Sequence, residues 1–155
     1  MKKNHSFYMQ KALEQAQRAF DVDEVPIGAV IVDAKGAIIA RAYNWVQKGC
    51  SQTEHAELRV IKKAGKKQGD WRLEGCWIYV TLQPCALCMN AIILSRLAGL
   101  VYGPKSPLFG YDTIIQEIGP LIYKTDALAI IDEICPEQSI ELLQKFFKLK
   151  RKKNE

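Results

Sequence analysis

Hydrophobic residues near the start of the chain recur at helical spacing. Within residues 6–20 the apolar side chains fall close to one helix face, namely Phe7, Ala12, Leu13, Ala16, Ala19 and Phe20. Asp21 and Asp23 then interrupt this face. A period near 3.6 residues is typical of a helix with one buried side. The pattern therefore predicts an amphipathic helix over residues 6–20.

Two short apolar runs follow this helix. Residues 27–32 form a continuous run of strand length after Pro26, and residues 37–40 form a second run. Between them, residues 33–36 (Asp-Ala-Lys-Gly) supply the chemistry of a turn. We expect a β-hairpin here, and we expect the mostly polar residues 44–53 to form a loop.

Helical and strand-like segments alternate through the rest of the chain. Helical patterns cover residues 54–64, 85–97 and 137–149, and strand-like patterns cover residues 76–82, 100–102 and 127–131. Two segments lack such a pattern: a basic loop framed by Gly65 and Gly69, and residues 104–123, which contain three prolines.

This alternation predicts α/β layers, in which a mixed sheet is covered on both faces. At 155 residues, of which 48% are hydrophobic, the chain can bury the core of one ordinary domain. No repeat or linker divides it, so we expect residues 1–155 to form a single domain. No run approaches the roughly 18 to 20 apolar residues of a membrane span, and the N-terminus does not resemble a signal peptide. We therefore expect a cytoplasmic protein that makes no contact with a membrane.

The net charge of +5 is concentrated at the C-terminus. Residues 148–155, the basic tail, hold five Lys and Arg residues and one Glu, which leaves the rest of the chain nearly neutral. Such a tail can contact phosphates, or it can be a solvated end that only aids solubility. A second basic cluster leaves the same two interpretations open and consists of Lys62, Lys63, Lys66 and Lys67.

Two short motifs point to metal chemistry. His55-Ala56-Glu57 is followed, after 26 residues, by Pro84-Cys85-Ala86-Leu87-Cys88. One imidazole and two thiols make three zinc ligands, and a catalytic zinc site has three protein ligands with water in its fourth position. We expect Pro84 to begin a helix whose positive end stabilises the Cys85 and Cys88 thiolates. Glu57 is then left to carry the proton of the bound water.

Two other interpretations of these cysteines stay open. Cys-x-x-Cys alone also occurs in redox pairs, although such a pair does not require His-x-Glu upstream. A structural zinc site would need a fourth ligand, which Cys50, Cys76 or His5 could supply. Neither interpretation gives Glu57 a role.

Both motifs belong to a pattern, His-x-Glu followed by Pro-Cys-x-x-Cys, that is the signature of zinc nucleobase deaminases. The chain resembles the bacterial tRNA-specific adenosine deaminases of the cytidine deaminase-like superfamily from its first predicted helix to its last. Beyond the zinc motifs, the resemblance rests on residues 23–30 (Asp-Glu-Val-Pro-Ile-Gly-Ala-Val), Asn44, residues 79–85, Ser95-Arg96 and the aromatic-basic ending at residues 146–151.

This resemblance implies a fold, a reaction and a cofactor. The fold is a three-layer α/β/α sandwich with a five-stranded mixed sheet, and the protein is a homodimer with one zinc ion per subunit. The reaction is deamination of adenosine to inosine at the wobble position of a tRNA anticodon. A base in a loop is already partly unstacked, so its extrusion into a pocket is less costly than from a duplex.

The resemblance also implies roles for single residues. His55, Cys85 and Cys88 are the zinc ligands, and Glu57 is the proton shuttle. In the substrate pocket, Asn44 binds the ribose or the base edge and Val25 lines the wall, although an Asn at this place can also simply stabilise a turn. Phe146 or Phe147 packs beside anticodon nucleotides, and at least one of them is expected in the core because both lie in an apolar helix. Lys148, Lys150 and Arg151 would contact the RNA.

The chain departs from the family pattern at three places. Gln83 replaces the family's Glu before Pro-Cys, and residues 51–54 (Ser-Gln-Thr-Glu) replace its Asp-Pro-Thr-Ala before the histidine. The loop at residues 104–112 lacks the family's Asp-x-Lys-x-Gly pattern. Glu54 adds a negative charge beside the site, and the altered loop concerns contacts with the RNA around the flipped base. The zinc motifs are intact.

Three functions therefore compete. The leading one is an RNA adenosine deaminase, and the second is a deaminase of a free nucleobase or nucleoside of guanine or cytosine type. The third, a noncatalytic RNA-binding subunit stabilised by zinc, does not need Glu57.

Overall fold

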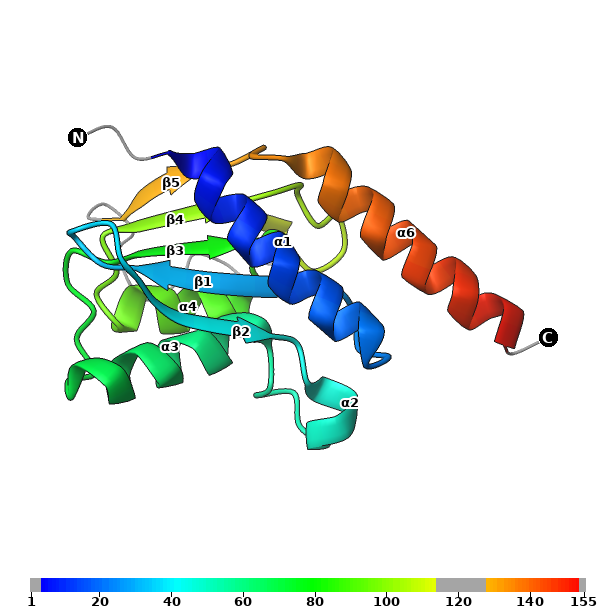
Figure 1. Ribbon diagram of the computed structural model, residues 1–155, viewed down its shortest axis with the longest axis horizontal. Helices are drawn as coiled ribbons and strands as arrows, with labels where there is room; N and C mark the ends of the chain where they lie inside the picture. Colours follow the sequence, from blue (N-terminus) through cyan, green and yellow to red (C-terminus); the bar gives the residue numbers. More distant parts are fainter. Residues whose placement is uncertain (1–3, 114–127, 154–155) are drawn as a thin grey trace.

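The computed structural model describes residues 4–113 and 128–153. Within them lie the helices α1 (His5–Asp21), α2 (Val46–Gly49), α3 (Ala56–Gln68), α4 (Ala86–Leu94) and α6 (Pro136–Lys153). The strands are β1 (Gly28–Val32), β2 (Ile38–Tyr43), β3 (Trp77–Val80), β4 (Gly99–Tyr102) and β5 (Ala129–Ile131) (Figure 1). None of the described helices combines the length and the apolar character needed to span a membrane.

The strands form one mixed sheet in the order β2-β1-β3-β4-β5. β1 is antiparallel to β2 and β3, whereas β3, β4 and β5 run parallel, which confirms the predicted hairpin. Gly28 pairs with Tyr43, and the Thr81 amide donates to the Gly28 carbonyl at 3.0 Å. The segments before β1, after β2 and after β3 therefore meet at the same end of these strands, and the functional site lies there.

Helices cover both faces of this sheet, so the three-layer α/β/α prediction is confirmed (Figure 1). Alternate residues of β1 point to opposite faces. Ala29 and Ile31 belong to the core beneath α3 and α4, and Val30 and Val32 belong to the core beneath α1. All five residues of β1 are buried, which is why residues 27–32 read as an unbroken apolar run instead of an alternating one.

Gly28 allows α1 to approach β1 closely. A Cβ atom at this position would overlap the Ala12 carbonyl oxygen and the Ala16 amide nitrogen of α1. The contact fixes α1 against the sheet just where the segment that follows α1 enters the site.

The structure corrects several predicted boundaries. The expected loop at residues 44–53 contains the short helix α2. Gly65 lies inside α3, which ends instead at Gly69, where a φ of 72° and a 2.9 Å hydrogen bond to the Gly65 carbonyl close the helix. The tail beyond residue 147 continues α6 as far as Lys153. Residues 114–123 of the segment without a prediction, and residue 127 of the last predicted strand, lie outside the described residues.

Candidate metal centre and substrate pocket

Two of the predicted ligands are N-cap residues of neighbouring helices. His55 caps α3 and Cys85 caps α4, each with an extended backbone (φ −64°, ψ 148° and φ −73°, ψ 172°). Neither side chain makes a capping hydrogen bond to its helix, and the two side chains converge instead. Pro84 therefore precedes the N-cap and does not begin the helix as expected; α4 starts at Ala86, and Cys88 lies in its first turn.

The three ligand atoms form a compact cluster. His55 Nδ1 lies 3.3 Å from Cys88 Sγ and 3.7 Å from Cys85 Sγ, and the donor atoms of all three residues lie within 4.8 Å of one another. In a tetrahedral zinc site, bond lengths near 2.0 Å to nitrogen and 2.3 Å to sulfur separate these atoms by about 3.6 Å. The cluster therefore fits a zinc ion.

Across the described ranges, no fourth His, Cys, Asp or Glu joins this cluster. His5 lies against Tyr79, with 3.1 Å between His5 Nδ1 and the tyrosine hydroxyl. Cys50 is exposed on the surface, and Cys76 is buried in the core beneath α3 and α4. Three protein ligands with one open corner are the pattern of a catalytic zinc site, whereas structural sites are closed by four.

The cluster favours a negatively charged sulfur at neutral pH. Hydrogen bonding from Cys88, and then from His55, lowers the pKa of the Cys85 thiol to about 4. The bond to Cys85 raises the pKa of the Cys88 thiol, and burial acts in the same direction. The hydrogen bond with Cys85 also raises the pKa of His55. The positive N-terminal end of α4 adds to the stabilisation of the thiolate, which is the form that binds a metal.

Glu57 lies beside the cluster in the first turn of α3. Its side chain is buried, with 5% of the residue exposed, and burial raises the pKa of the carboxyl group to about 7. A carboxyl group with a pKa near neutrality can both accept and return a proton at working pH. The environment therefore suits Glu57 to proton transfer.

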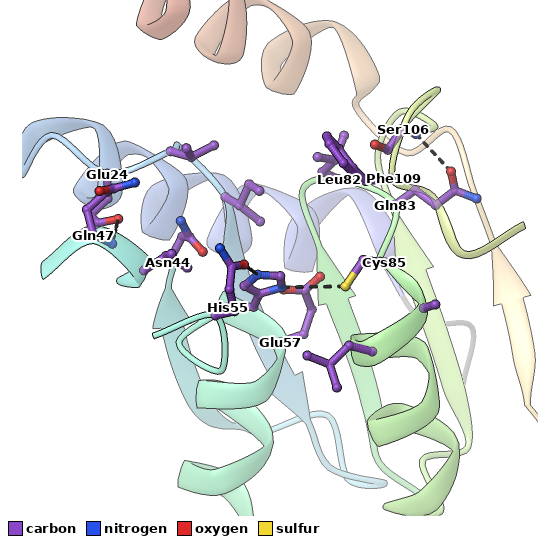
Figure 2. Close-up of a pocket in the computed structure, with 16 residues that line it drawn as sticks. Glu24, Asn44, Gln47, His55, Glu57, Leu82, Gln83, Cys85, Ser106 and Phe109 are labelled. Atoms are coloured by element: carbon purple, nitrogen blue, oxygen red, sulfur yellow. Dashed lines mark hydrogen bonds between the residues drawn. The ribbon is translucent and has the colours of Figure 1, made fainter. Parts of the chain in front are cut away.

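A cavity of about 610 Å³ opens onto the cluster, a size that suits a small organic ligand such as a nucleoside. Figure 2 shows His55, Glu57 and Cys85 together at its base. One wall comes from the segments around α2 and carries Glu24, Asn44 and Gln47. The opposite wall is formed by the segment after β3 and the loop after β4. The first carries Leu82 and Gln83, and the second carries Ser106 and Phe109.

Residues 2–104 match the family described as the cytidine and deoxycytidylate deaminase zinc-binding region. The chain belongs to this family. It is a zinc-dependent hydrolytic deaminase, and the cluster of His55, Cys85 and Cys88 is consistent with one zinc ion.

Relatives of known identity resemble the deaminase over most of its length. A tRNA-specific adenosine deaminase of Bacillus subtilis is 38% identical over 146 residues, which cover 94% of this chain and 90% of the relative. A solved structure from a study of A-to-I editing by tRNA:A34 deaminases at the wobble position is 35% identical, with a TM-score of 0.82, and the match covers 89% of this chain and 99% of that one. The guanine deaminase structure from Bacillus subtilis is 32% identical, with a TM-score of 0.67 and 77% and 79% coverage.

Both predicted pocket residues line the cavity of the deaminase. Asn44 is 5% exposed, and its backbone N–H donates to the Ile27 carbonyl at 3.0 Å. Val25 lines the same wall and is partly buried.

Sequence reasoning missed Glu24. Its fully buried carboxylate accepts hydrogen bonds from the backbone amides of Gln47 at 3.2 Å and Lys48 at 2.7 Å, and so holds the start of α2 against the pocket. The only signal in the sequence is its place directly before Val25.

The aromatic-basic ending lies apart from the cavity. Phe146 is 6% exposed and packs edge-on against Phe20, with ring centroids 6.0 Å apart, so it is a core residue, as expected for at least one of the two phenylalanines. A ring sealed between α1 and α6 has no free face. Phe147 is 46% exposed but does not line the cavity. Lys148 and Arg151 are exposed, whereas Lys150 forms an ion pair with Asp23 at 2.6 Å.

Proposed function

We propose that this deaminase converts adenosine to inosine at the wobble position of a tRNA anticodon. One observation carries the proposal: a buried carboxyl group, that of Glu57, lies beside a three-ligand cluster at the base of a cavity of nucleoside size. The named adenosine deaminase relatives support adenosine in tRNA as the substrate. In the overall reaction, water replaces the amino group on C6 of adenine, and ammonia leaves.

Zinc, when bound, supplies Lewis-acid activation that lowers the pKa of a water molecule to about 7. Glu57 would accept one proton of that water and deliver it to the purine ring as the C6–O bond forms. It would then carry the second proton from the new hydroxyl group to the amino group, which leaves as ammonia when the C6–N bond breaks. Its pKa of about 7 lets the same carboxyl group serve as base and then as acid. Because Glu57 is buried, its carboxyl group is shielded from bulk solvent between the two transfers.

The wall residues orient the nucleoside. The Asn44 side-chain amide can both donate and accept hydrogen bonds, so it suits the base edge or the ribose. Val25 offers an apolar surface to the face of the purine. We assign both to substrate binding because they line the cavity from the side of α2.

We assign RNA contact outside the cavity to the exposed face of α6. Phe147, Lys148 and Arg151 are exposed there. Lys150 can contribute only if it leaves its ion pair with Asp23. Replacing Lys148 and Arg151 with Ala should weaken RNA binding and reduce its dependence on salt, since each lost phosphate contact lowers the salt slope by about one. The matched control is replacement of Lys66 and Lys67, in the last turn of α3 and remote from His55.

We also propose that the deaminase forms a homodimer through α4. This helix is apolar on every side apart from Asn90. Met89 and Ile92 are buried in the core, while Leu87 and Leu94 are 51% and 49% exposed. Sedimentation equilibrium tests the assignment: the wild-type chain should sediment as a dimer, and Leu94→Lys should shift it toward monomer.

The proposed function is tested with a synthetic anticodon stem-loop that carries a wobble adenosine. The zinc-loaded protein should convert that adenosine to inosine, detected as a one-dalton mass increase and mapped by fragment sequencing. A fully zinc-loaded, folded protein that leaves the RNA unchanged would contradict the proposal. Because its proposed substrate is tRNA, we expect the enzyme to act in the cytoplasm.

A second candidate is a deaminase of free guanine. The likeness to the guanine deaminase structure, at 32% identity, favours testing it. The same preparation incubated with guanine, adenosine or cytidine should release no ammonia if RNA is the substrate. Rapid turnover of guanine together with an unchanged stem-loop would favour this second function.

A further inference from the structure

Gln83 joins the base of the pocket to the loop that follows β4. Its side-chain oxygen accepts from the Ser106 amide at 2.9 Å, and its side-chain nitrogen donates to the Asp112 carboxylate at 2.9 Å. Its backbone N–H donates to the Pro104 carbonyl at 3.0 Å. The residue is only 3% exposed. Three hydrogen bonds from one buried residue therefore hold both ends of the loop at residues 104–112.

The tip of this loop is held in a tight turn. The Gly110 amide donates to the Ser106 carbonyl at 3.0 Å, and the Tyr111 amide donates to the Pro84 carbonyl at 2.9 Å. A Cβ atom at Gly110 would overlap the Gln83 side chain, so the glycine lets the loop close over it. The arrangement projects the two residues before Gly110 outward.

Those two residues differ in their relation to the cavity. Leu108 is 75% exposed and does not line it. Phe109 is 68% exposed and does line it, on the wall shared with Leu82 (Figure 2). An aromatic ring that borders a nucleoside-sized cavity, and still presents most of its surface to solvent, offers a flat apolar face at the entrance.

We propose that Phe109 stacks on the nucleobase adjacent to the reacting adenosine, and that Gln83 is the positioning residue that sets its ring at the pocket mouth. This inference rests on the proposed function. When one nucleoside fills the cavity, its neighbours in the RNA chain must leave through the entrance, next to Phe109. Base–aromatic stacking tolerates any base, so Phe109 would contribute affinity for polynucleotide over free nucleoside.

The kinetic test compares Phe109 variants on the zinc-loaded enzyme with the stem-loop substrate. Phe109→Ala should raise KM about tenfold and change kcat by less than about twofold, as expected for the loss of one stacked base. Phe109→Tyr should behave as wild type. Phe109→Leu should behave as Phe109→Ala, because it keeps apolar volume but lacks a ring. Leu108→Ala is the matched control and should leave both constants unchanged.

Two modified RNAs identify the stacked base. One carries an abasic site on the 5′ side of the wobble adenosine and the other on the 3′ side. The penalty of Phe109→Ala should disappear on one of them, since no base then remains to stack. A penalty that persists on both RNAs, or a Phe109→Leu variant as active as wild type, would overturn the inference. Failure of the wild-type enzyme to convert the unmodified stem-loop would instead contradict the proposed function.

A binding measurement judges the stacking contact without turnover. Two stem-loops carry 2-aminopurine, one on the 5′ side and one on the 3′ side of the wobble adenosine. Binding to the wild-type protein should quench the fluorescence of one of them. Binding to Phe109→Ala should quench neither. Equal quenching by both proteins would contradict the proposed stacking by Phe109, whether or not inosine forms.

The role of Gln83 is tested by exchanging donor and acceptor. In Gln83→Glu, two carboxylates face each other at the Asp112 contact, and KM should rise as in Phe109→Ala. The double variant Gln83→Glu with Asp112→Asn restores one donor and one acceptor, and KM should return toward the wild-type value. Zinc content should be the same in all three proteins. A double variant no better than Gln83→Glu would remove Gln83 from the proposal.

Discussion

His55 and Cys85 occupy the same position in two different helices. Each is an N-cap residue, and His55 Nδ1 lies 3.7 Å from Cys85 Sγ. Two helix N-termini thus face one small volume, which places two positive helix ends around negative sulfur. The geometry of the metal centre is set by how α3 and α4 pack, since both ligands begin those helices.

Glu57→Gln tests the proton carrier. The variant keeps the shape of the side chain but cannot take up a proton, so kcat should fall by about a thousandfold, within the range known for general acid–base groups. Zinc content and thermal unfolding should stay as in wild type. Glu54→Gln is the control, because this carboxylate pairs with Arg59 at 3.2 Å outside the cluster and should be dispensable for turnover. A Glu57→Gln enzyme of normal activity would favour the noncatalytic interpretation.

The low pKa of Cys85 predicts an unusual alkylation profile in the metal-free protein. Because its pKa is lowered to about 4, Cys85 remains a thiolate as the pH falls from about 8 to about 6. Its rate of reaction with iodoacetamide, followed by peptide mass spectrometry, should therefore change little over this range. In the urea-unfolded chain, the same thiol should slow by about 100-fold. Zinc should protect Cys85, and a chelator should remove the protection and the activity together.

Gly28→Ala tests the close contact between α1 and β1. The added Cβ overlaps the backbone of α1 at Ala12 and Ala16, so we expect a loss of about 3 kcal/mol in the free energy of unfolding. Gly69→Ala is the comparison: nothing lies within 4 Å of its Cβ, but its φ of 72° is strained for alanine. That variant should lose only about 1 kcal/mol. Urea denaturation measures both, and equal losses would show that the overlap at Gly28 relaxes.

Glu24→Gln tests the attachment of α2 to the pocket. The buried carboxylate accepts from two backbone amides, and an amide side chain can accept through only one of its two end atoms. We expect a local loss of about 1 to 3 kcal/mol, seen as faster hydrogen exchange at the Gln47 and Lys48 amides. Glu14→Gln, on the exposed side of α1, should leave those amides unchanged. Unchanged exchange in Glu24→Gln would show that α2 holds without this carboxylate.

Much of the fold follows from local patterns. The apolar run at residues 27–32 predicted a strand because β1 is buried on both faces. The sequence pattern predicts helix α3 only over residues 54–64, because Gly65 is a typical stop signal, whereas the helix closes at Gly69. Helix α2 has only four residues, which are too few to show a helical period. It is held by Glu24, which lies 23 residues before Gln47, and no local pattern reveals such a contact.

The candidate site divides in the same way. His55, Glu57, Cys85 and Cys88 follow from short motifs, because each motif lies within one turn of one helix. The wall that carries Phe109 depends on Gln83, whose partners lie 23 and 29 residues away, and no spacing reveals such contacts. Periodicity also does not reveal which of Phe146 and Phe147 is buried. The contact of Phe146 with Phe20, a residue of α1, decides this.

The sheet separates the helices that begin with metal ligands from α6, which lies beside α1 (Figure 1). α6 does contact the segment before Cys85, where the buried Ser139 hydroxyl donates to the Thr81 carbonyl. Substitutions on the exposed face of α6, away from Ser139, should therefore leave the ligand cluster undisturbed. Their free energies should add to those of changes near Glu57. Over evolution, the exposed face proposed to contact RNA can therefore change in sequence while the metal ligands and Glu57 stay the same.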